Sequence, residues 1–478
     1  MIKVGCAILM NLLILLLTGV NCIAQEVKPN VVFILADDLG YGDLGVYGQQ
    51  LIRTPHLDAL SRRGLRFTQF YTGSPVCAPS RSALMTGQHT GHTPIRGNKQ
   101  MQPEGQAPLP AAAFTIAELF KKAGYATGDF GKWGLGFVGT SGDPNKQGFD
   151  RFFGYNCQRL AHDYYPDHLW NNEQRVELPN APGQTKVYSA DLIQQEALHF
   201  ISANHQKPFF LFLSYTLPHA GLDVPEEDSM LQRYIRQFRE QPVPPQNKPA
   251  GSLYKNQSYP HATYAAMVSK LDAYVGQVVA RLKELKIDKN TLIIFASDNG
   301  PHKEGGNDPA FFNSNGGLRG IKRDVYEVGI RTPLIACWPA VIKPGVNQKY
   351  TGAFWDFLAT FADITAQKIP AGTDGISLLP VLEGKKLPPS RRYLYWEFHE
   401  EGGKQAVRMG QWKAVRLSAM KLEPGAIQLY NLKSDPFEKT DVADKNKSIV
   451  ERMKNIMLEA HNETTEFPFM ATKAIRSL

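Results

Sequence analysis

Acidic and amide side chains follow two strongly apolar runs of the 478-residue sequence. Asp37 and Asp38 come directly after one run, and Asp298 and Asn299 come after another. Three carboxylates and an amide oxygen form a donor set that suits Ca²⁺, with Mg²⁺ as second choice, and not zinc or copper. Either pair alone is more typical of a helix cap or a turn. The prediction of a divalent cation site therefore depends on the two pairs lying together.

A cysteine lies at the start of an expected helix. Cys77 follows turn residues, Pro79 and Ser80 fall in the first helical turn, and Arg81 comes one turn later. A helix N-terminus favours an anionic group. A lone cysteine is more often a small buried hydrophobic residue, but the turn residues and Arg81 argue against a purely apolar setting.

Buried strands are expected to position these side chains. The strand-like runs are Val31–Leu35, Phe209–Leu213 and Leu292–Phe295, and the second run leads to His219. Each run is apolar on both faces, which is typical of strands covered by helices on both sides of a sheet. Helical patterns cover residues 54–64, 115–124, 188–204 and 263–285. The alternation predicts an α/β domain, in which ligands bind beyond the carboxyl ends of the strands.

The last part of the chain has a different pattern. Residues 384–389 (GKKLPP) are typical of a linker. Four short strand-like pieces follow, at 393–398, 406–409, 412–417 and 427–432, and then a helical pattern over 447–466. We predict a catalytic domain over residues 25–384 and a small α+β subdomain over 385–478, with an antiparallel sheet and a terminal helix.

The N-terminal residues 1–24 are typical of a signal peptide. Lys3 precedes an apolar stretch that is shorter than the ~20 residues of a spanning helix, and a small-residue pattern ends at Ala24. We expect an exported, periplasmic protein without a transmembrane segment; secretion, or a lipid anchor through Cys22, is the alternative. Cys157 and Cys337 would remain beside Cys77, and their pairing is permitted but not predicted.

Composition excludes several classes of protein. The chain is 43% hydrophobic, so fully disordered and fibrous classes are excluded. Its formal net charge is +8, but no block of five lysines or arginines occurs, which argues against a nucleic-acid partner. Five cysteines are too few for a disulfide scaffold.

Ordered motifs across nearly the whole chain resemble the type I sulfatases of the alkaline phosphatase superfamily, especially secreted bacterial glycan exosulfatases. The signature is Cys77-Ala78-Pro79-Ser80-Arg81, followed by Leu84, Thr86 and Gly87. The further motifs are Asp37-Asp38, Gly131-Lys132-Trp133, Pro218-His219, Asp298-Asn299-Gly300, Leu318–Lys322, Tyr326-Glu327, Gly329–Arg331 and Leu429–Leu432 with Asp435, Pro436 and Glu438. The resemblance implies an alkaline phosphatase-like fold with a large, mixed, mostly parallel sheet sandwiched by helices.

The resemblance also implies a mechanism. In that family a maturing enzyme oxidises the cysteine to Cα-formylglycine, and the aldehyde hydrates to a gem-diol. One hydroxyl attacks sulfur and displaces the alcohol, and the other then expels sulfate. Carried over by motif, the Ca²⁺ ligands are Asp37, Asp38, Asp298, Asn299 and an oxygen of modified Cys77, and Asp298 is also a candidate to take the nucleophile's proton.

Four further residues are expected around the sulfate from their motif positions. Arg81 would orient the gem-diol, and Lys132 and Lys322 would bind sulfate oxygens. His219 would contact the ester and help to protonate the leaving alkoxide. The alternatives without a catalytic role are that the lysines face solvent and that the histidine is an ordinary loop residue.

Two positions depart from the family pattern. Gly134 stands where the family commonly has a histidine that serves formylglycine proton transfer; either Asp298, water, His302 or His162 substitutes, or the elimination runs differently. Val328 replaces a usual glycine, and we expect only local consequences.

The segment from Asn156 to Trp170 is the candidate sugar subsite. Its aromatic residues, His162, Asp163 and His168 would contact a sugar, with His302 as a further contact; a packed loop is the alternative. By analogy we expect an exo-acting enzyme on sulfated hexose or hexosamine, with galactose or N-acetylgalactosamine 4-O-sulfate ahead of 6-O-sulfate. The competing functions are a phosphodiesterase or phosphonate monoester hydrolase, and a catalytically inactive protein that binds sulfated glycans.

Overall fold

The computed structural model describes residues 28–180, 184–243, 254, 257–385 and 393–469. The predicted signal peptide lies outside these residues, as do residues 386–389 of the predicted linker. Within the described ranges, no helix has the length and apolar character needed to cross a membrane.

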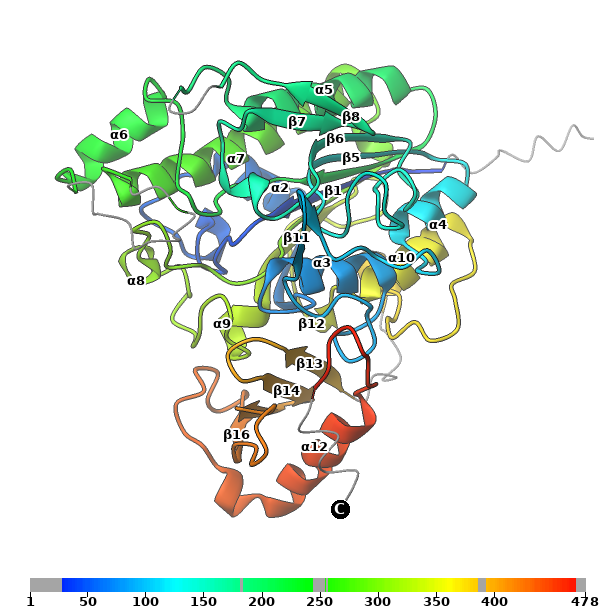
Figure 1. The fold of residues 1–478 in the computed structure, drawn as a ribbon, viewed down its shortest axis with the longest axis vertical. Helices are drawn as coiled ribbons and strands as arrows, with labels where there is room; N and C mark the ends of the chain where they lie inside the picture. The colour runs from blue at the N-terminus through cyan, green and yellow to red at the C-terminus, as the bar shows by residue number, and fades with distance from the viewer. Residues whose placement is uncertain (1–27, 181–183, 244–253, 255–256, 386–392, 470–478) are drawn as a thin grey trace, which may run out of the picture.

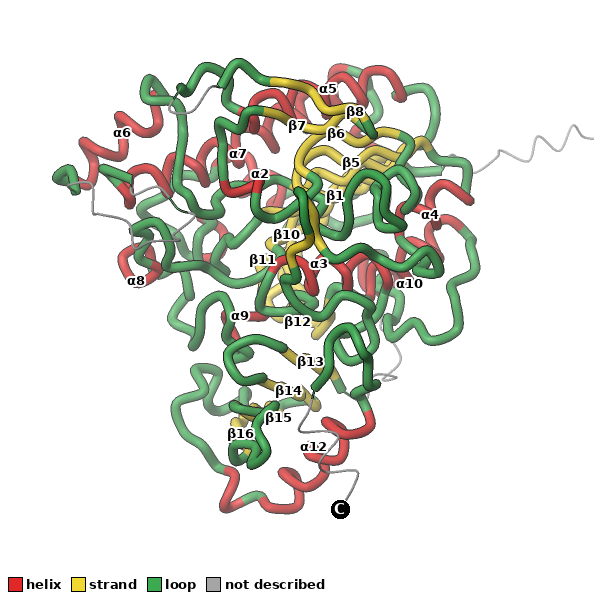
Figure 2. Tube along the Cα trace, viewed as in Figure 1, coloured by secondary structure: helices red, strands yellow, loops and turns green. Residues whose placement is uncertain are grey.

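A ten-stranded mixed sheet forms the centre of the larger part of the molecule (Figures 1 and 2). Its order is β12-β2-β11-β10-β1-β9-β5-β6-β7-β8. The strands are β1 (Asn30–Ala36), β2 (Leu65–Tyr71), β5 (Ala126–Lys132), β6 (Arg151–Tyr155), β7 (His168–Asn171), β8 (Gln174–Glu177), β9 (Phe209–Ser214), β10 (Thr291–Ser297), β11 (Arg331–Cys337) and β12 (Val346–Ala353). Strands β10, β1, β9, β5 and β6 run parallel, whereas β11 and β7 are antiparallel to their neighbours. The predicted α/β class with a mostly parallel sheet is confirmed.

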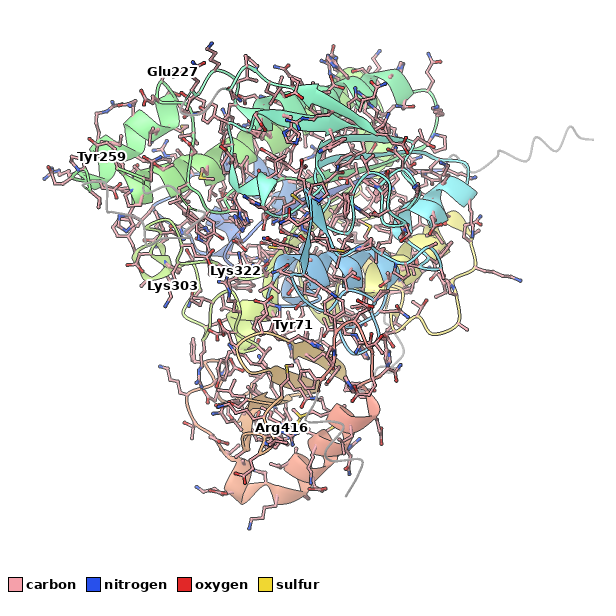
Figure 3. The ribbon with its side chains drawn as sticks, in the orientation of Figure 1. Tyr71, Glu227, Tyr259, Lys303, Lys322 and Arg416 are labelled. Atoms are coloured by element: carbon pink, nitrogen blue, oxygen red, sulfur yellow. The ribbon has the colours of Figure 1, made fainter. Side chains whose placement is uncertain are left out.

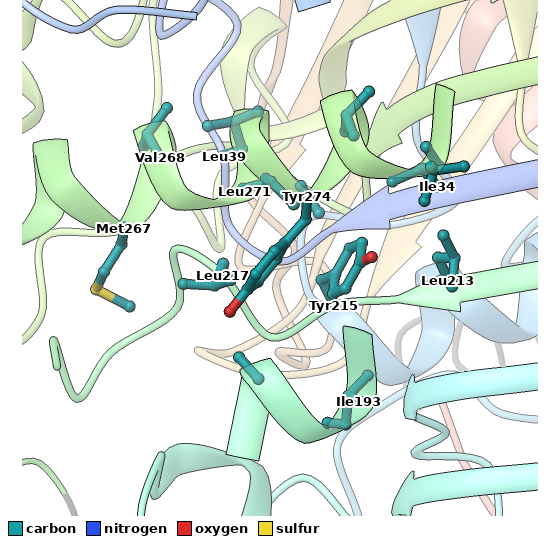
Figure 4. Close-up of a cluster of buried hydrophobic side chains, with 14 of the residues drawn as sticks. Ile34, Leu39, Ile193, Leu213, Tyr215, Leu217, Met267, Val268, Leu271 and Tyr274 are labelled. Atoms are coloured by element: carbon teal, nitrogen blue, oxygen red, sulfur yellow. The ribbon is translucent and has the colours of Figure 1, made fainter. Parts of the chain in front are cut away.

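Helices cover both faces of this sheet. The first face carries α2 (Pro55–Arg62), α5 (Ser189–Asn204), α6 (Ser229–Phe238) and α7 (Pro260–Glu284). The second face carries α3 (Cys77–Thr86), α4 (Ile116–Lys122), α10 (Asp356–Thr365) and α11 (Leu379–Leu382). Two short helices, α8 (Pro309–Phe312) and α9 (Glu327–Ile330), occur between β10 and β11 along the chain. Figure 4 shows part of the first core, which includes Ile34 of β1, Ile193 of α5 and Leu271 of α7. A capping box formed by Thr115 and Glu118 begins α4, within the predicted helical pattern 115–124.

A second, antiparallel sheet lies below the first in Figure 1. It consists of β13 (Leu394–Phe398), β14 (Lys404–Met409), β15 (Trp412–Leu417) and β16 (Ile427–Asn431), and α12 (Lys447–Glu459) packs on one face. The other face packs on the larger part, where Trp396 meets Tyr71 and Trp355. The terminal helix ends at Glu459 and not at residue 466 as predicted. A two-stranded hairpin, β3 (Gln100–Met101) and β4 (Gly105–Gln106), completes the described strands.

Candidate active site

The residues that follow β1 and β10 meet at one edge of the large sheet. The Asp298 N–H donates to the carbonyl of Ala36 (3.0 Å), and the Asp38 N–H donates to Oδ1 of Asp298 (3.2 Å). These strands are parallel neighbours, so their carboxyl ends deliver both polar pairs to the same place. Both pairs, including Asn299, are fully buried.

Each of the three buried carboxylates is paired with a cationic side chain. The pairs are Asp37 Oδ2 with Lys132 Nζ (2.5 Å), Asp38 Oδ2 with Lys322 Nζ (2.7 Å) and Asp298 Oδ2 with Arg81 Nη2 (2.9 Å). The cations come from the end of β5, the loop before α9 and the first turns of α3. Figure 3 labels Lys322 in the larger part of the molecule, above the small antiparallel sheet. The structure therefore brings the expected acids and cations into one cluster.

Cys77 is the first residue of α3 and lies against this cluster. Its Sγ is 3.3 Å from Oδ1 of Asp37, and the residue is 2% exposed. Burial, followed by the charge of Asp37, raises the pKa of the Cys77 thiol well above its usual value. A protonated thiol is a poor nucleophile, so the unmodified side chain is badly suited to attack an ester.

Arg81 is fixed from two sides. Its Nε donates to Oδ2 of Asp298 (3.0 Å), and its Nη1 donates to the carbonyl of Lys132 (2.5 Å). Burial opposes the charge on Lys132 and on Lys322, but Asp37 raises the pKa of Lys132 and Asp38 raises the pKa of Lys322. All three cations are therefore charged at neutral pH.

His219 closes the cluster on the side of the β9 loop. Its Nε2 lies 3.3 Å from Oδ2 of Asp38 and 3.1 Å from Nζ of Lys322. Its ring stacks on the ring of His162, with centroids 4.6 Å apart and an interplanar angle of 5°. Burial and then Lys322 lower the pKa of His219 well below its usual value, and burial and then His219 lower the pKa of His162 to about 2. Both imidazoles are neutral at pH 7.

The donor atoms fit a hard divalent cation. Oδ1 of Asn299 is buried without a hydrogen-bond partner. Single ligand atoms of Asp37, Asp38, Cys77 and His219 lie within 4.8 Å of one another. Although burial raises the pKa of Asp37, Lys132 and the other cations hold it well below its usual range, so the carboxylate is ionised. Oxygen donors of this kind suit Ca²⁺ better than a transition metal.

A cavity of about 430 Å³ is lined by His162, whose ring stacks on that of His219. His162, Asp163 and His168 of the candidate sugar segment line it, together with Gly221 and the β3–β4 hairpin. Tyr164 also lines it, but its buried hydroxyl donates to the carbonyls of Thr216 and His219. The tyrosines of this segment are therefore packed into the protein, whereas its histidines and Asp163 form a wall of the cavity.

His302 is not among the residues that line this cavity. Its Nε2 lies 3.1 Å from the carbonyl of Pro218, and its ring centroid is 6.1 Å from that of His219. His302 therefore supports the loop that carries His219. Cys157 and Cys337 are buried free thiols, so the permitted disulfide does not form.

Sequence reasoning missed three residues around the site. Glu304 lies 3.7 Å from Nζ of Lys322, and Glu104 of the hairpin accepts from the ring of Trp170 (3.0 Å). Gln158 occupies the space beside Gly134: a Cβ at residue 134 would lie 2.5 Å from Nε2 of Gln158, and its φ of +72° favours glycine. None of the three has a spacing signal, and only the missing histidine at residue 134 draws attention to Gln158.

Comparisons with known proteins agree with this site. The sulfatase family model matches residues 29–367, and the model of the C-terminal part of N-sulphoglucosamine sulphohydrolase matches residues 320–463. An arylsulfatase of Hemicentrotus pulcherrimus is 34% identical over 84% of this chain and 70% of its own length.

Two further relatives cover almost the whole chain. The N-acetylgalactosamine-6-O-sulfatase of Bacteroides thetaiotaomicron is 30% identical over 93% of this chain and 96% of its own. The crystal structure of Ps i-CgsB in complex with k-i-k-neocarrahexaose has a TM-score of 0.74 and 29% identity, covering 92% of this chain and 96% of that chain. With its acids, cations and cysteine gathered at the edge of an α/β sheet, the chain is an enzyme that belongs to the sulfatase family.

Proposed function

We propose that the enzyme hydrolyses O-sulfate esters of a carbohydrate, using a Cα-formylglycine formed from Cys77 by a maturing enzyme, with a bound Ca²⁺. The observation that carries the proposal is the position of Cys77, 3.3 Å from Asp37 and inside a cluster of three carboxylates and three cations. The modified residue would supply a hydroxyl nucleophile, and the cation would lower its pKa and offset charge on the sulfate.

The side chains around residue 77 have distinct tasks in this proposal. Asp37, Asp38, Asp298 and Asn299 would hold the cation. Lys132 and Lys322 are charged and buried, so they bind sulfate oxygens as point charges. Arg81, fixed by Asp298 and the Lys132 carbonyl, orients residue 77.

Proton transfer would involve Asp298 and His219. Burial and the charge of Asp37 raise the pKa of Asp298 to about 7, which suits a group that accepts the nucleophile's proton near neutral pH. His219 is neutral in the free enzyme, so its first interaction with the bound ester would be a hydrogen bond. A sulfate anion beside it would raise its pKa and allow it to protonate the leaving alkoxide.

The substrate is proposed to be a sulfated hexose or hexosamine, attacked at the end of a glycan. Relatives named as N-acetylgalactosamine-6-sulfatases favour galactose or N-acetylgalactosamine 6-O-sulfate. The sequence alone placed 4-O-sulfate first, so both positions belong in the test. The cavity near His219 has the size of a small-molecule site, and its lining by Glu104, Asp163 and His168 favours a polar sugar ring over an apolar group.

The decisive experiment measures sulfate release from a panel of monosulfated sugars, with Cys77→Ser as the control. We expect release from a 6-O- or 4-O-sulfated galactose or N-acetylgalactosamine and none from the variant. Mass analysis of the peptide containing Cys77 should show the aldehyde. Full activity of Cys77→Ser, or of enzyme that retains its thiol, would reject the proposed nucleophile.

The two competing functions give other results. A phosphodiesterase or phosphonate monoester hydrolase would have a higher kcat/KM on an aryl phosphate diester or phosphonate than on an aryl sulfate. An inactive glycan-binding protein would bind sulfated sugars without releasing sulfate.

We also propose export to the periplasm, on the basis of residues 1–24 alone. Cell fractionation should recover the protein with an N-terminus at Gln25. An intact N-terminus in the cytoplasmic fraction would contradict this.

A further inference from the structure

A second cavity, of about 330 Å³, lies at the junction between the two sheets. Its wall includes Gln69, Glu327 and Arg331 of the larger part, and Arg408 and Lys433 of the part that contains the small sheet. None of these side chains belongs to the catalytic cluster. The charged residues of the wall are three cations and one acid, a balance that favours an anion as ligand.

Arg408 is the wall residue whose charge is least compensated. Its Nε donates to the carbonyl of Gly410 (3.3 Å), its Nη1 to the hydroxyl of Tyr71 and its Nη2 to Oε1 of Gln69. Burial raises the pKa of Tyr71, so all three acceptors are uncharged. In the part of the chain that the structure describes, no carboxylate lies within ion-pair distance of Arg408. The side chain is nevertheless buried, at 7% exposure, where an unpaired charge is costly.

Arg331 also keeps a donor without an acceptor. Its Nη1 donates to Oε2 of Glu327 (3.0 Å) and its Nη2 to the carbonyl of Thr68, but its buried Nε has no hydrogen-bond partner. The Tyr71 hydroxyl connects the two arginines, because it accepts from Arg408 and donates to Oε2 of Glu327 (2.7 Å). Both guanidinium groups are therefore held at the same wall of the cavity.

The acids of the junction do not balance these charges. Oε1 of Glu327 accepts from Lys413 (3.0 Å), so this carboxylate is shared between a lysine and an arginine. Lys413 is also paired with Glu438 (3.0 Å), whose pKa is raised by burial. Lys413 and the two arginines thus face two acids, and the exposed Lys433 adds a further positive charge at the cavity.

We propose that this cavity is a second anion site, which binds a sulfate group either as free sulfate or as an ester on a sugar. Guanidinium groups bind oxyanions through paired N–H···O bonds, and sulfate oxygens are acceptors, as the unused donors require. The volume is sufficient for a small molecule. Arg331 comes from β11 and Arg408 from β14, so the bound group would also join the two parts of the molecule. The inference adds a site to the proposed function and does not depend on it.

The test counts and locates bound sulfate. Equilibrium dialysis with radiolabelled sulfate at low ionic strength gives the affinity, and selenate soaked into crystals is located by its anomalous scattering. We expect selenate at Arg331 and Arg408, with the catalytic cluster as the internal reference. Arg408→Gln should weaken binding at the junction by at least about tenfold, and Lys433→Gln should weaken it severalfold.

A matched control is Lys421→Gln. Lys421 is exposed in the loop between β15 and β16 and does not line the cavity, so the same loss of charge there should leave the affinity unchanged. Urea unfolding gives a second measurement. Sulfate should stabilise the parent more than Arg408→Gln, relative to chloride at equal ionic strength; the general salting effect of sulfate cancels in this difference.

A sulfated sugar distinguishes the two sources of the sulfate group. N-acetylgalactosamine 6-sulfate is added to the Cys77→Ala variant, which should bind it without turnover. Displacement of radiolabelled sulfate from the junction would assign the site to sulfated sugars, and retention of the label would assign it to the free ion.

The outcomes separate this proposal from the proposed function. A cavity without selenate, or equal junction affinity in Arg408→Gln and the parent, would overturn the second site and leave the sulfatase function standing. If Arg408→Gln does not fold, Lys433→Gln decides, and an unchanged affinity would overturn the proposal. An equal loss of affinity in Lys421→Gln would show general attraction by positive charge and would overturn it as well. Sulfate bound at the junction of an enzyme that releases none from any sugar would contradict the proposed function alone.

Discussion

The catalytic cluster and the junction between the two sheets are both buried groups of charged side chains, but the pKa values of their carboxyl groups differ. In the junction, Lys413 Nζ lies 3.0 Å from Glu327 and 3.0 Å from Glu438. Glu327 also accepts from the hydroxyl of Tyr71 (2.7 Å) and from Arg331 (3.0 Å). Figure 3 labels Tyr71 between the larger part and the small sheet.

A third carboxylate in the junction also has several protein partners. Glu397 of β13 meets Arg96 (3.1 Å), His399 (2.8 Å), His461 (2.7 Å) and the hydroxyl of Tyr395 (2.8 Å). These groups come from both parts of the molecule, so the charges hold the two sheets together. In the junction, Glu327 and Glu397 each accept from several protein donors.

In the catalytic cluster, one buried oxygen has no hydrogen-bond partner and one carboxyl has a raised pKa. Oδ1 of Asn299 has no partner, and the pKa of Asp298 is raised to about 7 by burial and Asp37. By contrast, Lys413 holds the pKa of Glu327 at about 2 although burial opposes it. The difference teaches that Glu327 is held ionised as a structural ion pair, whereas Asp298 titrates near neutral pH, as a group that exchanges a proton must.

The largest expected effect is on the catalytic cluster. Asp38→Asn should lower kcat/KM by at least about a hundredfold, because it removes a charge from the proposed cation site. Bound calcium, measured by elemental analysis, should fall in parallel, while the folded state persists. An Asp38→Asn enzyme with unchanged calcium and activity would place the cation elsewhere.

The junction should respond in stability and not in catalysis. Lys413→Met leaves Glu327 and Glu438 buried without their shared cation, which should cost about 3–5 kcal/mol in urea unfolding. The kcat of the folded fraction should be unchanged. Adding Glu438→Gln should recover part of the loss, and a variant as stable as the parent would refute the role given to Lys413.

Acid should weaken the junction in a defined range. The pKa of Glu327 is about 2 in the folded protein, below its usual value of 4.5. The stabilisation is therefore complete above about pH 4.5 and is lost as the pH falls toward 2, by on the order of 3 kcal/mol. Unfolding free energies between pH 6 and pH 3 should fall less steeply in Glu327→Gln. An equal slope in both proteins would contradict this.

A glycine pair gives the smallest and sharpest contrast. Gly134 and Gly124 both have positive φ, but a Cβ at Gly124 meets nothing within 4 Å, whereas one at Gly134 meets Gln158. Alanine at either position should cost about 1 kcal/mol of stability. Gly134→Ala alone should also lower activity, measured as sulfate release. Equal activities would show that Gln158 is not needed in its present position.

Much of the central sheet follows from the sequence. The three apolar runs became β1, β9 and β10, because continuous apolar residues can only be buried between two helical layers. β5 was missed because its sequence ATGDFGK mixes glycine and charge, and burial there depends on neighbours distant in sequence. The exposed edge strand β12 lacks an apolar run altogether.

Some residues of the candidate site could likewise be predicted from the sequence, and others could not. The strand ends predicted that Asp37 and Asp298 would lie together, since parallel strands share an edge. Lys132 came only from the motif resemblance, whereas the strand run before His219 had already placed that histidine at the same edge. Glu104 and Glu304 could not be found, because their position depends on a hairpin and a loop whose paths no local pattern specifies.

The enclosure of α3 has a consequence for the order of events in biogenesis. Every residue of this helix is buried, and Cys77 lies at its first position. An oxidising enzyme has no access to such a side chain once the two helical layers have closed. The proposed oxidation of Cys77 would have to precede folding. The supply of active enzyme would then depend on the rate of that oxidation relative to the rate at which the chain folds.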